Sequence, residues 1–231
     1  MSLNNYRIAT YKTVTKEDFK EIRELSSKQC VFCEPHPLKI ILESGHFYVS
    51  LDSSPLIMGH LLIHSKEHIG CAGEVFEPAK FDELEEIKNL LAKTCDKLYG
   101  NHIFFEHGRA GHCGIKYGLD QRVCHHFHLH ILPEKLSMQE DLANRFEEHK
   151  LKNYSDIVNL YDRLGHYLYF ENVNGDMYYY PADDSIESHL LRTIISNKLE
   201  TPEKADWQHY HNCKELNEAK KLYIEELMKI V

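Results

Sequence analysis

Polar and apolar positions alternate most regularly in residues 126–132. Three histidines, His126, His128 and His130, occupy every second position, and Phe127, Leu129 and Ile131 lie between them. Successive side chains of a strand point to opposite faces, so this segment is predicted to be a β-strand with an apolar face in the core. The other face then carries three imidazoles, an arrangement that is rare in half-buried strands and that we expect to have a chemical role.

The longest helical pattern covers residues 78–98. Apolar residues recur there at steps of three and four, namely Phe81, Leu84, Ile87, Leu91, Cys95 and Leu98. This spacing predicts one long amphipathic helix, with Gly100 placed to cap its C-terminus. Strand patterns in residues 46–51 and 59–64 enclose a turn-rich segment and predict an antiparallel pair, and another strand is expected in residues 103–106.

Shorter helical patterns occur in both parts of the chain. Further helices are expected from residue 15 towards residue 25, from residue 137, and in residues 155–164, 186–199 and 214–230. Between them, residues 166–181 alternate aromatic and polar side chains around Asn174-Gly175, which predicts a β-hairpin. We therefore divide the chain near residue 136 into residues 1–135 and an extension, residues 136–231, that consists of helices and this hairpin.

The aromatic side chains of the hairpin have two interpretations. They are Tyr167, Tyr169, Phe170, Tyr178, Tyr179 and Tyr180. Such rings stack on a nucleobase or on a partner surface, but cross-strand aromatic pairs also stabilise small hairpins, and the second interpretation is favoured. Trp207 is interpreted in the same way, as a packing residue.

Composition narrows the class of protein. Hydrophobic content is 42% and no apolar run is long enough to span a bilayer, so no membrane association and a cytoplasmic location are expected. The formal charge of −9 disfavours binding to a nucleic-acid polymer, whereas a small nucleotide needs only a local pocket. The seven cysteines are scattered along a chain of 231 residues and are expected to be reduced thiols.

Three imidazoles on one strand face are compatible with three kinds of chemistry. They are the ligands of a metal, a nucleophile with its hydrogen-bonding partners, or solvated side chains. Periodicity alone does not choose between the metal and the nucleophile.

Residues 126–132 resemble the signature of the histidine triad family, in which three histidines alternate with hydrophobic residues. Residues 52–68 are similar to an earlier family segment, residues 30–33 match its Cys-x-x-Cys, and residues 105–108 occupy the place of a short motif before the triad. The resemblance covers about residues 25–135. The remainder resembles the extension of a bacterial branch. The resemblance to the histidine triad family implies an α+β fold with an antiparallel sheet and a long amphipathic helix.

The resemblance also implies roles for individual residues. In this family the middle histidine attacks the α-phosphate of a nucleotide, so His128 is expected to form a covalent nucleotidyl-imidazole that water then cleaves. His126 and His130 are expected to bond the phosphate oxygens, and His60 to lie beside the triad. Asp52 matches the residue that binds the ribose hydroxyls, although an Asp also commonly caps a turn.

Two further residues complete the nucleotide site that the resemblance implies, namely Glu106 and Arg122. The segment before the triad departs from the family pattern, so we expect Arg122 or His125 to assist the leaving group. The third histidine is present where the transferase branch has Gln, which makes hydrolysis the better expectation. No organic cofactor is expected.

A structural zinc ion is the expected cofactor. Cys30 and Cys33 have the spacing of two ligands of one metal. In zinc-bearing relatives the remaining ligands would correspond to His68 and His126, and His64 competes with His68. Two reduced thiols in a packed turn explain the same Cys-x-x-Cys equally well.

Three functions follow as alternatives. The leading one is a nucleotide hydrolase that cleaves the α-phosphorus bond of a nucleoside phosphoramidate or a dinucleoside polyphosphate through nucleotidyl-His128. The others are a nucleotide-binding or sensing module with little turnover, and a metalloenzyme whose three histidines hold one catalytic metal. Family members generally form dimers, so a homodimer with a small-molecule nucleotide substrate is expected.

Overall fold

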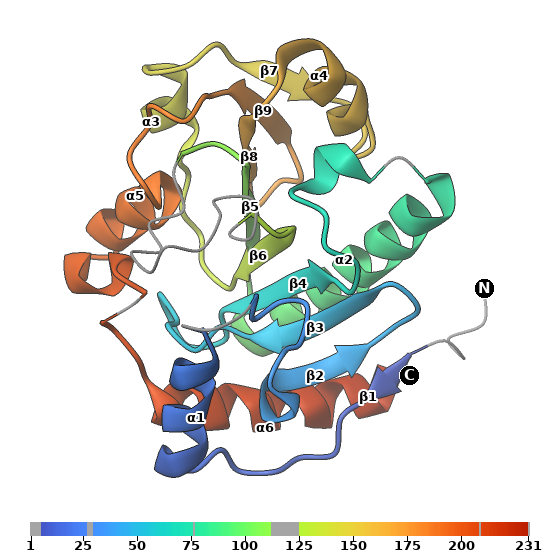
Figure 1. The fold of residues 1–231 in the computed structure, drawn as a ribbon, viewed down its shortest axis with the longest axis vertical. Coiled ribbons are helices and arrows are strands. Elements are labelled where there is room, and N and C mark those ends of the chain that lie inside the picture. Colours follow the sequence, from blue (N-terminus) through green and yellow to red (C-terminus); the bar gives the residue numbers. More distant parts are fainter. Residues whose placement is uncertain (1–5, 27–29, 76, 112–124, 208, 231) are drawn as a thin grey trace.

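Strands from both parts of the chain form one mixed-length antiparallel sheet (Figure 1). The computed structural model describes residues 6–26, 30–75, 77–111, 125–207 and 209–230. Within these residues the strand order is β1-β2-β3-β4-β6-β5-β8-β9-β7. The strands are β1 (Arg7–Ile8), β2 (Ile40–Glu43), β3 (Phe47–Leu51), β4 (Leu61–Ser65), β5 (Ile103–Gly108), β6 (His128–Leu132), β7 (His149–Leu151), β8 (Tyr167–Glu171) and β9 (Met177–Pro181).

Helices pack on both sides of this sheet, and the predicted α+β class is confirmed. The helices are α1 (Lys16–Ser26), α2 (Pro78–Tyr99), α3 (Gln139–Ala143), α4 (Asp156–Leu164), α5 (Leu190–Lys198) and α6 (Cys213–Ile230). Figure 1 shows α2 and α5 on opposite sides of β5 and β6, with α6 running beneath β1, β2 and β3.

Helix α2 is the long amphipathic helix that was predicted for residues 78–98. Its buried residues include Phe81, Leu84, Ile87, Leu91 and Cys95, which are the spaced apolar positions of the sequence. The helix ends at Gly100, whose φ of 91° is left-handed and whose amide donates to the carbonyl of Asp96. The stripe of apolar side chains therefore fixes this helix against the sheet.

The two faces of the sheet carry separate cores. Leu129 and Ile131 of β6, and Phe127 just before it, pack on the face covered by α2, together with Phe104 and Tyr169. The opposite face packs side chains of β5, β8 and β9 against α3 and α5, including Ile103, Phe105, Phe170, Leu191 and Ile195. Because side chains alternate along a strand, the imidazoles of β6 lie on this second side.

The predicted hairpin is β8 and β9, and it extends the sheet from β5. Phe105 of β5 pairs with Phe170 of β8, and Gly175 has a φ of 79° in the connecting turn. The tyrosine rings are buried, with Tyr167 stacked on Tyr179 at 4.7 Å between centroids, as the packing interpretation expected. The boundary near residue 136 stays a prediction, and β8 of the extension pairs with the edge of β5.

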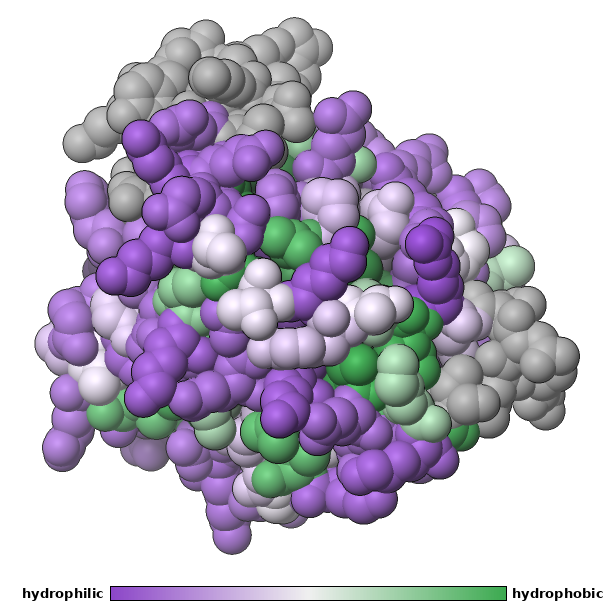
Figure 2. All heavy atoms as spheres, turned by 90° about the horizontal axis from the view of Figure 1, so that it is seen from below, coloured by the Kyte–Doolittle hydropathy of each residue, from purple (hydrophilic) through white to green (hydrophobic). Residues whose placement is uncertain are grey.

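The surface is mainly polar. Figure 2 shows that hydrophilic residues cover most of the face seen from below, with hydrophobic residues in small separate areas. No helix in the described part of the chain combines the length and the apolar character needed to cross a membrane. The homodimer stays a prediction.

Candidate functional site: an imidazole row beside a cysteine and histidine cluster

Strand β6 occupies the middle of the sheet and presents its histidines to a cavity. It pairs with β4 on one side, where Leu62 lies opposite His130 and His64 lies opposite His128. On the other side Phe105 of β5 lies opposite His130. These pairs place His128 and His130 on one face, next to each other, with 5.0 Å between the ring centroids.

His128 has one ring nitrogen fixed by a backbone carbonyl. Its Nδ1 lies 2.7 Å from the carbonyl oxygen of His126, which only accepts, so Nδ1 carries the proton. The lone pair of Nε2 therefore remains available in the cavity. The ring of Phe32 stacks on the imidazole at 4.6 Å and 16°, and burial lowers the pKa of His128.

His130 and His60 form a short relay. The amide of Leu56 donates to Nδ1 of His60 at 3.3 Å, so Nε2 of His60 carries the proton and donates to Nδ1 of His130 at 2.9 Å. His130 must then hold its own proton on Nε2. Burial lowers the pKa of His60 to about 4, so this ring is neutral near pH 7. As a result, Nε2 of His130 carries a proton and can donate a hydrogen bond.

His126 has no ring nitrogen left for a phosphate. Its Nε2 donates to the carbonyl of Ser65 at 2.7 Å. Its Nδ1 faces the sulfur atoms of Cys30 at 3.4 Å and Cys33 at 3.6 Å. The role of phosphate donor that the family resemblance gave to His126 is therefore not supported, whereas its alternative role as a metal ligand is.

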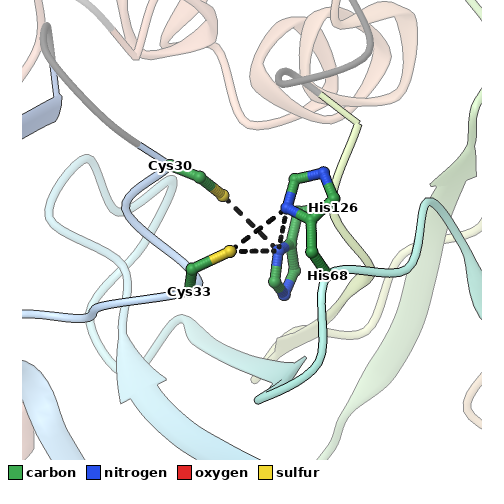
Figure 3. A group of neighbouring side chains, drawn as sticks. All are labelled: Cys30, Cys33, His68 and His126. Carbon is green, nitrogen blue, oxygen red and sulfur yellow. Dashed lines mark hydrogen bonds between the residues drawn. The ribbon is translucent and has the colours of Figure 1, made fainter.

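Four side chains converge beside the triad, as Figure 3 shows for Cys30, Cys33, His68 and His126. Their ligand atoms all lie within 4.8 Å of one another. Cys33 Sγ lies 3.1 Å from Nδ1 of His68, and the Nδ1 atoms of His68 and His126 are 3.3 Å apart. A tetrahedral zinc with bonds of about 2.3 Å to sulfur and 2.0 Å to nitrogen has edges of about 3.3 Å between nitrogens, about 3.5 Å between nitrogen and sulfur, and about 3.8 Å between sulfurs.

This geometry is compatible with a structural zinc ion. Burial and the neighbouring Cys30 raise the pKa of Cys33 to about 11, so this thiol is protonated near neutral pH unless a metal binds it. The carbonyl of Ser65 fixes the ring of His126 from behind, as the partners of metal-bound histidines commonly do. His64 is not part of the cluster, because its ring is buried against Phe32 and its Nε2 contacts Ser50.

The imidazole row opens into a cavity with a volume of about 200 Å³. Elements from both parts of the chain line it. The polar lining includes Lys39, Asp52, His107, His125, His128, His130, His189 and Arg192, and the apolar lining includes Ile22, Val31, Phe32 and Leu62. The mixed polar and apolar lining suits a small organic molecule with charged groups.

Asp52 reaches the cavity but is already bound. Its Oδ2 accepts from Nη1 of Arg192 at 2.9 Å, and its Oδ1 accepts from the amide of Ser54 at 2.8 Å. Burial works to raise the pKa of Asp52, but Arg192, His60, the amide of Ser54 and Lys39 together outweigh it, and the pKa falls below its usual range. Asp52 is therefore a carboxylate that forms a buried ion pair with α5.

Glu106 does not join the site. It alternates with Phe105 and His107 along β5, so it points to the opposite side of the sheet. There its carboxyl accepts from the amide of Ala72 at 2.9 Å and from the hydroxyl of Tyr167 at 2.9 Å. The prediction of a nucleotide-binding Glu106 is not supported. Arg122 lies outside the described residues, whereas His125 lines the cavity.

Comparison with known protein families shows to which family the chain belongs. The family described as proteins similar to the C-terminal region of CwfJ matches residues 17–147, which is more than half of the chain and includes the cluster and the imidazole row. The chain belongs to this family. No curated protein matches the chain.

Several solved structures are similar to this CwfJ-like chain. A hypothetical histidine triad nucleotide-binding protein from Sulfolobus tokodaii is 16% identical, covers 81% of this chain and 82% of its own, and has a TM-score of 0.38. Yeast Ap4A phosphorylase in complex with AMP is 14% identical, and the match covers 70% of this chain and 67% of the phosphorylase chain, with a TM-score of 0.44. A zinc-bound histidine triad family protein from Mycobacterium smegmatis is 24% identical, with 58% and 91% covered and a TM-score of 0.33.

Sequence reasoning missed the contribution of the extension. Arg192, His189 and Trp207 line the cavity, and the indole of Trp207 donates to Nε2 of His189 at 2.9 Å. Lys39 and His107 were also missed. For His107 the sequence held one signal, its position two residues after Phe105, which puts it on the same face as His130. For Arg192 the sequence pattern held no sign of a contact with Asp52.

Proposed function

We propose that the chain is a nucleotide hydrolase of the histidine triad type, in which His128 is the nucleophile. Its Nε2 attacks the α-phosphorus of a nucleoside phosphoramidate or a dinucleoside polyphosphate. A nitrogen–phosphorus bond forms as the bond to the leaving group breaks. Water then attacks the same phosphorus and releases the nucleoside monophosphate and the free imidazole.

One observation carries this proposal. The hydrogen bond from Nδ1 of His128 to the carbonyl of His126, at 2.7 Å, places the ring in the tautomer whose Nε2 is unprotonated. This atom belongs to a side chain that lines the cavity. A neutral imidazole with its second nitrogen held as a donor is the form that attacks an electrophile.

His130 would supply the stabilising hydrogen bond. The relay from Leu56 through His60 leaves the proton of His130 on Nε2, beside the ring of His128. A fixed donor in a cavity with little water stabilises the charge that grows on phosphate oxygens. Phe105 stacks on His130 at 4.3 Å and 4°, which keeps this donor in one plane. His125 is the candidate proton source for the leaving group.

Zinc would have a structural role here. Cys30, Cys33, His68 and His126 supply four ligands, which leaves no open position for a substrate. Bound there, zinc would fix the turn that carries Phe32 against His128. The alternative of one catalytic metal on the three triad histidines lacks support, because His126 faces the cysteines whereas His130 is bonded to His60.

The test is the capture of the intermediate. The protein is incubated with radiolabelled adenosine and guanosine phosphoramidates and with dinucleoside polyphosphates, quenched in alkali, and analysed for a nucleotide bound to histidine. A labelled wild-type protein and an unlabelled His128→Ala variant are expected. His46→Ala is the matched control, because this histidine is half exposed and pairs with Glu83 away from the cavity.

Binding without turnover is the second candidate function. Nucleotide affinity in both wild type and His128→Ala, with no product and no labelled intermediate for any substrate class, would replace the hydrolase by a sensing module.

A further inference from the structure

Helix α5 of the extension is tied to the imidazole row at two points, and it packs beside β5 (Figure 1). The amide of Leu191 donates to Nε2 of His107 at 3.2 Å. His107 lies two residues after the β5 partner of His130, so it is on the same face of the sheet. Nη1 of Arg192 donates to Oδ2 of Asp52 at 2.9 Å. The first turn of α5 is therefore fixed at the cavity that the imidazole row lines.

His189 directly precedes this turn and lines the cavity. Its φ of 61° and ψ of 29° are left-handed, a backbone conformation that costs free energy for a residue with a β-carbon. Its side chain makes no hydrogen bond to the first turn of α5, so helix capping does not account for a histidine at this position. The role of the ring has to come from its other contacts.

Trp207 fixes the tautomer of His189. The indole Nε1 of Trp207 lies 2.9 Å from Nε2 of His189. An indole N–H only donates, so Nε2 accepts and the proton of His189 is on Nδ1. Burial lowers the pKa of His189 to about 4, so the ring is neutral near pH 7. Trp207 therefore makes His189 a neutral donor whose N–H is at Nδ1.

This N–H is available to a ligand. Among the described residues no group accepts a hydrogen bond from Nδ1 of His189, and Nδ1 is not one of the buried side-chain atoms that lack a partner. The N–H is therefore accessible to water in the free protein. An acceptor on a ligand in the cavity can replace that water and make the same hydrogen bond.

A phosphate oxygen is the acceptor that suits this donor best. The proposed function puts the α-phosphate of the nucleotide at His128, which lines the same cavity. Phosphate oxygens carry negative charge and accept stronger hydrogen bonds than the neutral atoms of a base or a sugar. Charge also grows on them during the attack, and a donor that is already fixed in direction stabilises this charge without reorganising.

We propose that His189 is a substrate-binding residue that donates from Nδ1 to a phosphate oxygen of the nucleotide, and that Trp207 is the positioning residue that keeps the proton there. The inference rests on the proposed function for the placing of the phosphate. It gives the extension a direct part in recognising the substrate, with a donor outside the triad.

The experiment compares affinities by calorimetry. Adenosine and guanosine 5′-monophosphates are titrated first, and the nucleoside of the tighter one is then measured by competition against it. His189→Leu should weaken binding of the monophosphate by about tenfold and change binding of the nucleoside by less than about twofold, because only the phosphate loses a hydrogen bond. His46→Leu, at the half-exposed pair with Glu83, should bind both like wild type.

His189→Asn is the matched rescue variant. The amide nitrogen of Asn is as many bonds from Cβ as Nδ1 of histidine and also carries a donor, and Asn accepts left-handed backbone more readily than most residues. Binding of the monophosphate to this variant should stay within about threefold of wild type. Thermal unfolding of both His189 variants without ligand checks that each is folded.

Trp207→Phe tests the positioning role. It removes the indole N–H, so the proton of His189 is free to move to Nε2, and the monophosphate should bind about threefold more weakly. In the His189→Asn background the same change should have no further effect, because the Asn amide carries its donor without Trp207. Equal losses in the two backgrounds would make Trp207 a packing residue and overturn its positioning role.

The remaining outcomes separate the two proposals. Unchanged binding of the monophosphate in His189→Leu, equal losses for monophosphate and nucleoside, or no recovery in His189→Asn would overturn the role of His189 and leave the hydrolase standing. The expected losses together with an unlabelled His128 for every substrate class would remove the hydrolase and leave His189 as a phosphate donor. Failure of every nucleotide to bind wild type would remove both.

Discussion

Strands β5 and β6 bury polar groups on both of their faces, and the two faces differ in what those groups can still do. On one face Glu106 accepts hydrogen bonds from Ala72, Tyr154 and Tyr167 inside a packed core. On the other, the Nε2 lone pair of His128 and the Nε2 proton of His130 have no hydrogen-bond partner among the described residues and lie at a cavity. A buried polar group with all its partners in place is structural, whereas one with an open position at a cavity is a candidate for chemistry.

The largest expected effect comes from the nucleophile. His128→Ala should lower turnover by about 10³-fold or more, because no intermediate can form, while nucleotide affinity changes by less than about threefold. Steady-state kinetics and calorimetry on the same preparation measure both quantities. Glu106→Gln, on the opposite face, is the matched comparison and should keep turnover within about threefold. Equal losses of turnover in His128→Ala and Glu106→Gln would contradict the assignment of chemistry to one face of the sheet and structure to the other.

The zinc cluster gives the next effect. His126→Ala should reduce bound zinc from one per chain to almost none and lower the free energy of unfolding by about 4 kcal/mol. For a chain of this size that corresponds to a fall in Tm of roughly 8–16 °C. Metal analysis and thermal unfolding test the prediction, with His128→Ala expected to retain its zinc. A chelator that leaves the Tm of wild type unchanged would contradict a structural zinc.

Glu106 should make stability depend on pH. Burial raises the pKa of Glu106 to about 7 from its ordinary value of 4.5, so the folded state holds a proton that the unfolded state has lost. The stabilisation is complete below about pH 4.5 and is lost as pH rises through 7, a change of up to about 3 kcal/mol. Urea unfolding at pH 5 and pH 8 should show this loss in wild type but not in Glu106→Gln.

The exposed Glu77→Gln variant serves as the control for that comparison, since its side chain is 68% exposed. Parallel pH profiles for wild type and Glu106→Gln would mean that Glu106 keeps its ordinary pKa in the folded protein.

The smallest effect concerns a single hydroxyl. Tyr167→Phe removes the donor that lies 2.9 Å from Glu106, and it should cost about 1 kcal/mol of stability at pH 8. The loss should be smaller at pH 5, where the carboxyl is protonated and needs fewer donors. Urea titrations at the two pH values measure the difference, and a loss that is the same at both would show that the hydroxyl does not serve the carboxylate.

Local patterns in the sequence determined the elements that hold the site. The alternation of residues 126–132 predicts β6 and puts His128 and His130 on one face, and the spacing of α2 and its cap at Gly100 follow from the same kind of pattern. The three short strands β1, β2 and β7 were missed, since two to four residues carry no measurable period. Helix α5 begins at Leu190, four residues later than expected.

Contacts between distant residues were decided only by the tertiary structure. The sequence placed His126 both in the triad and among the zinc ligands, and only the tertiary structure shows that one ring nitrogen meets the carbonyl of Ser65 while the other faces the cysteines. The sequence likewise named Asp52 but gave no sign of Arg192, which lies 140 positions away in the chain. A strand period fixes the face of a side chain, but which donor or charge meets it there depends on how distant segments pack.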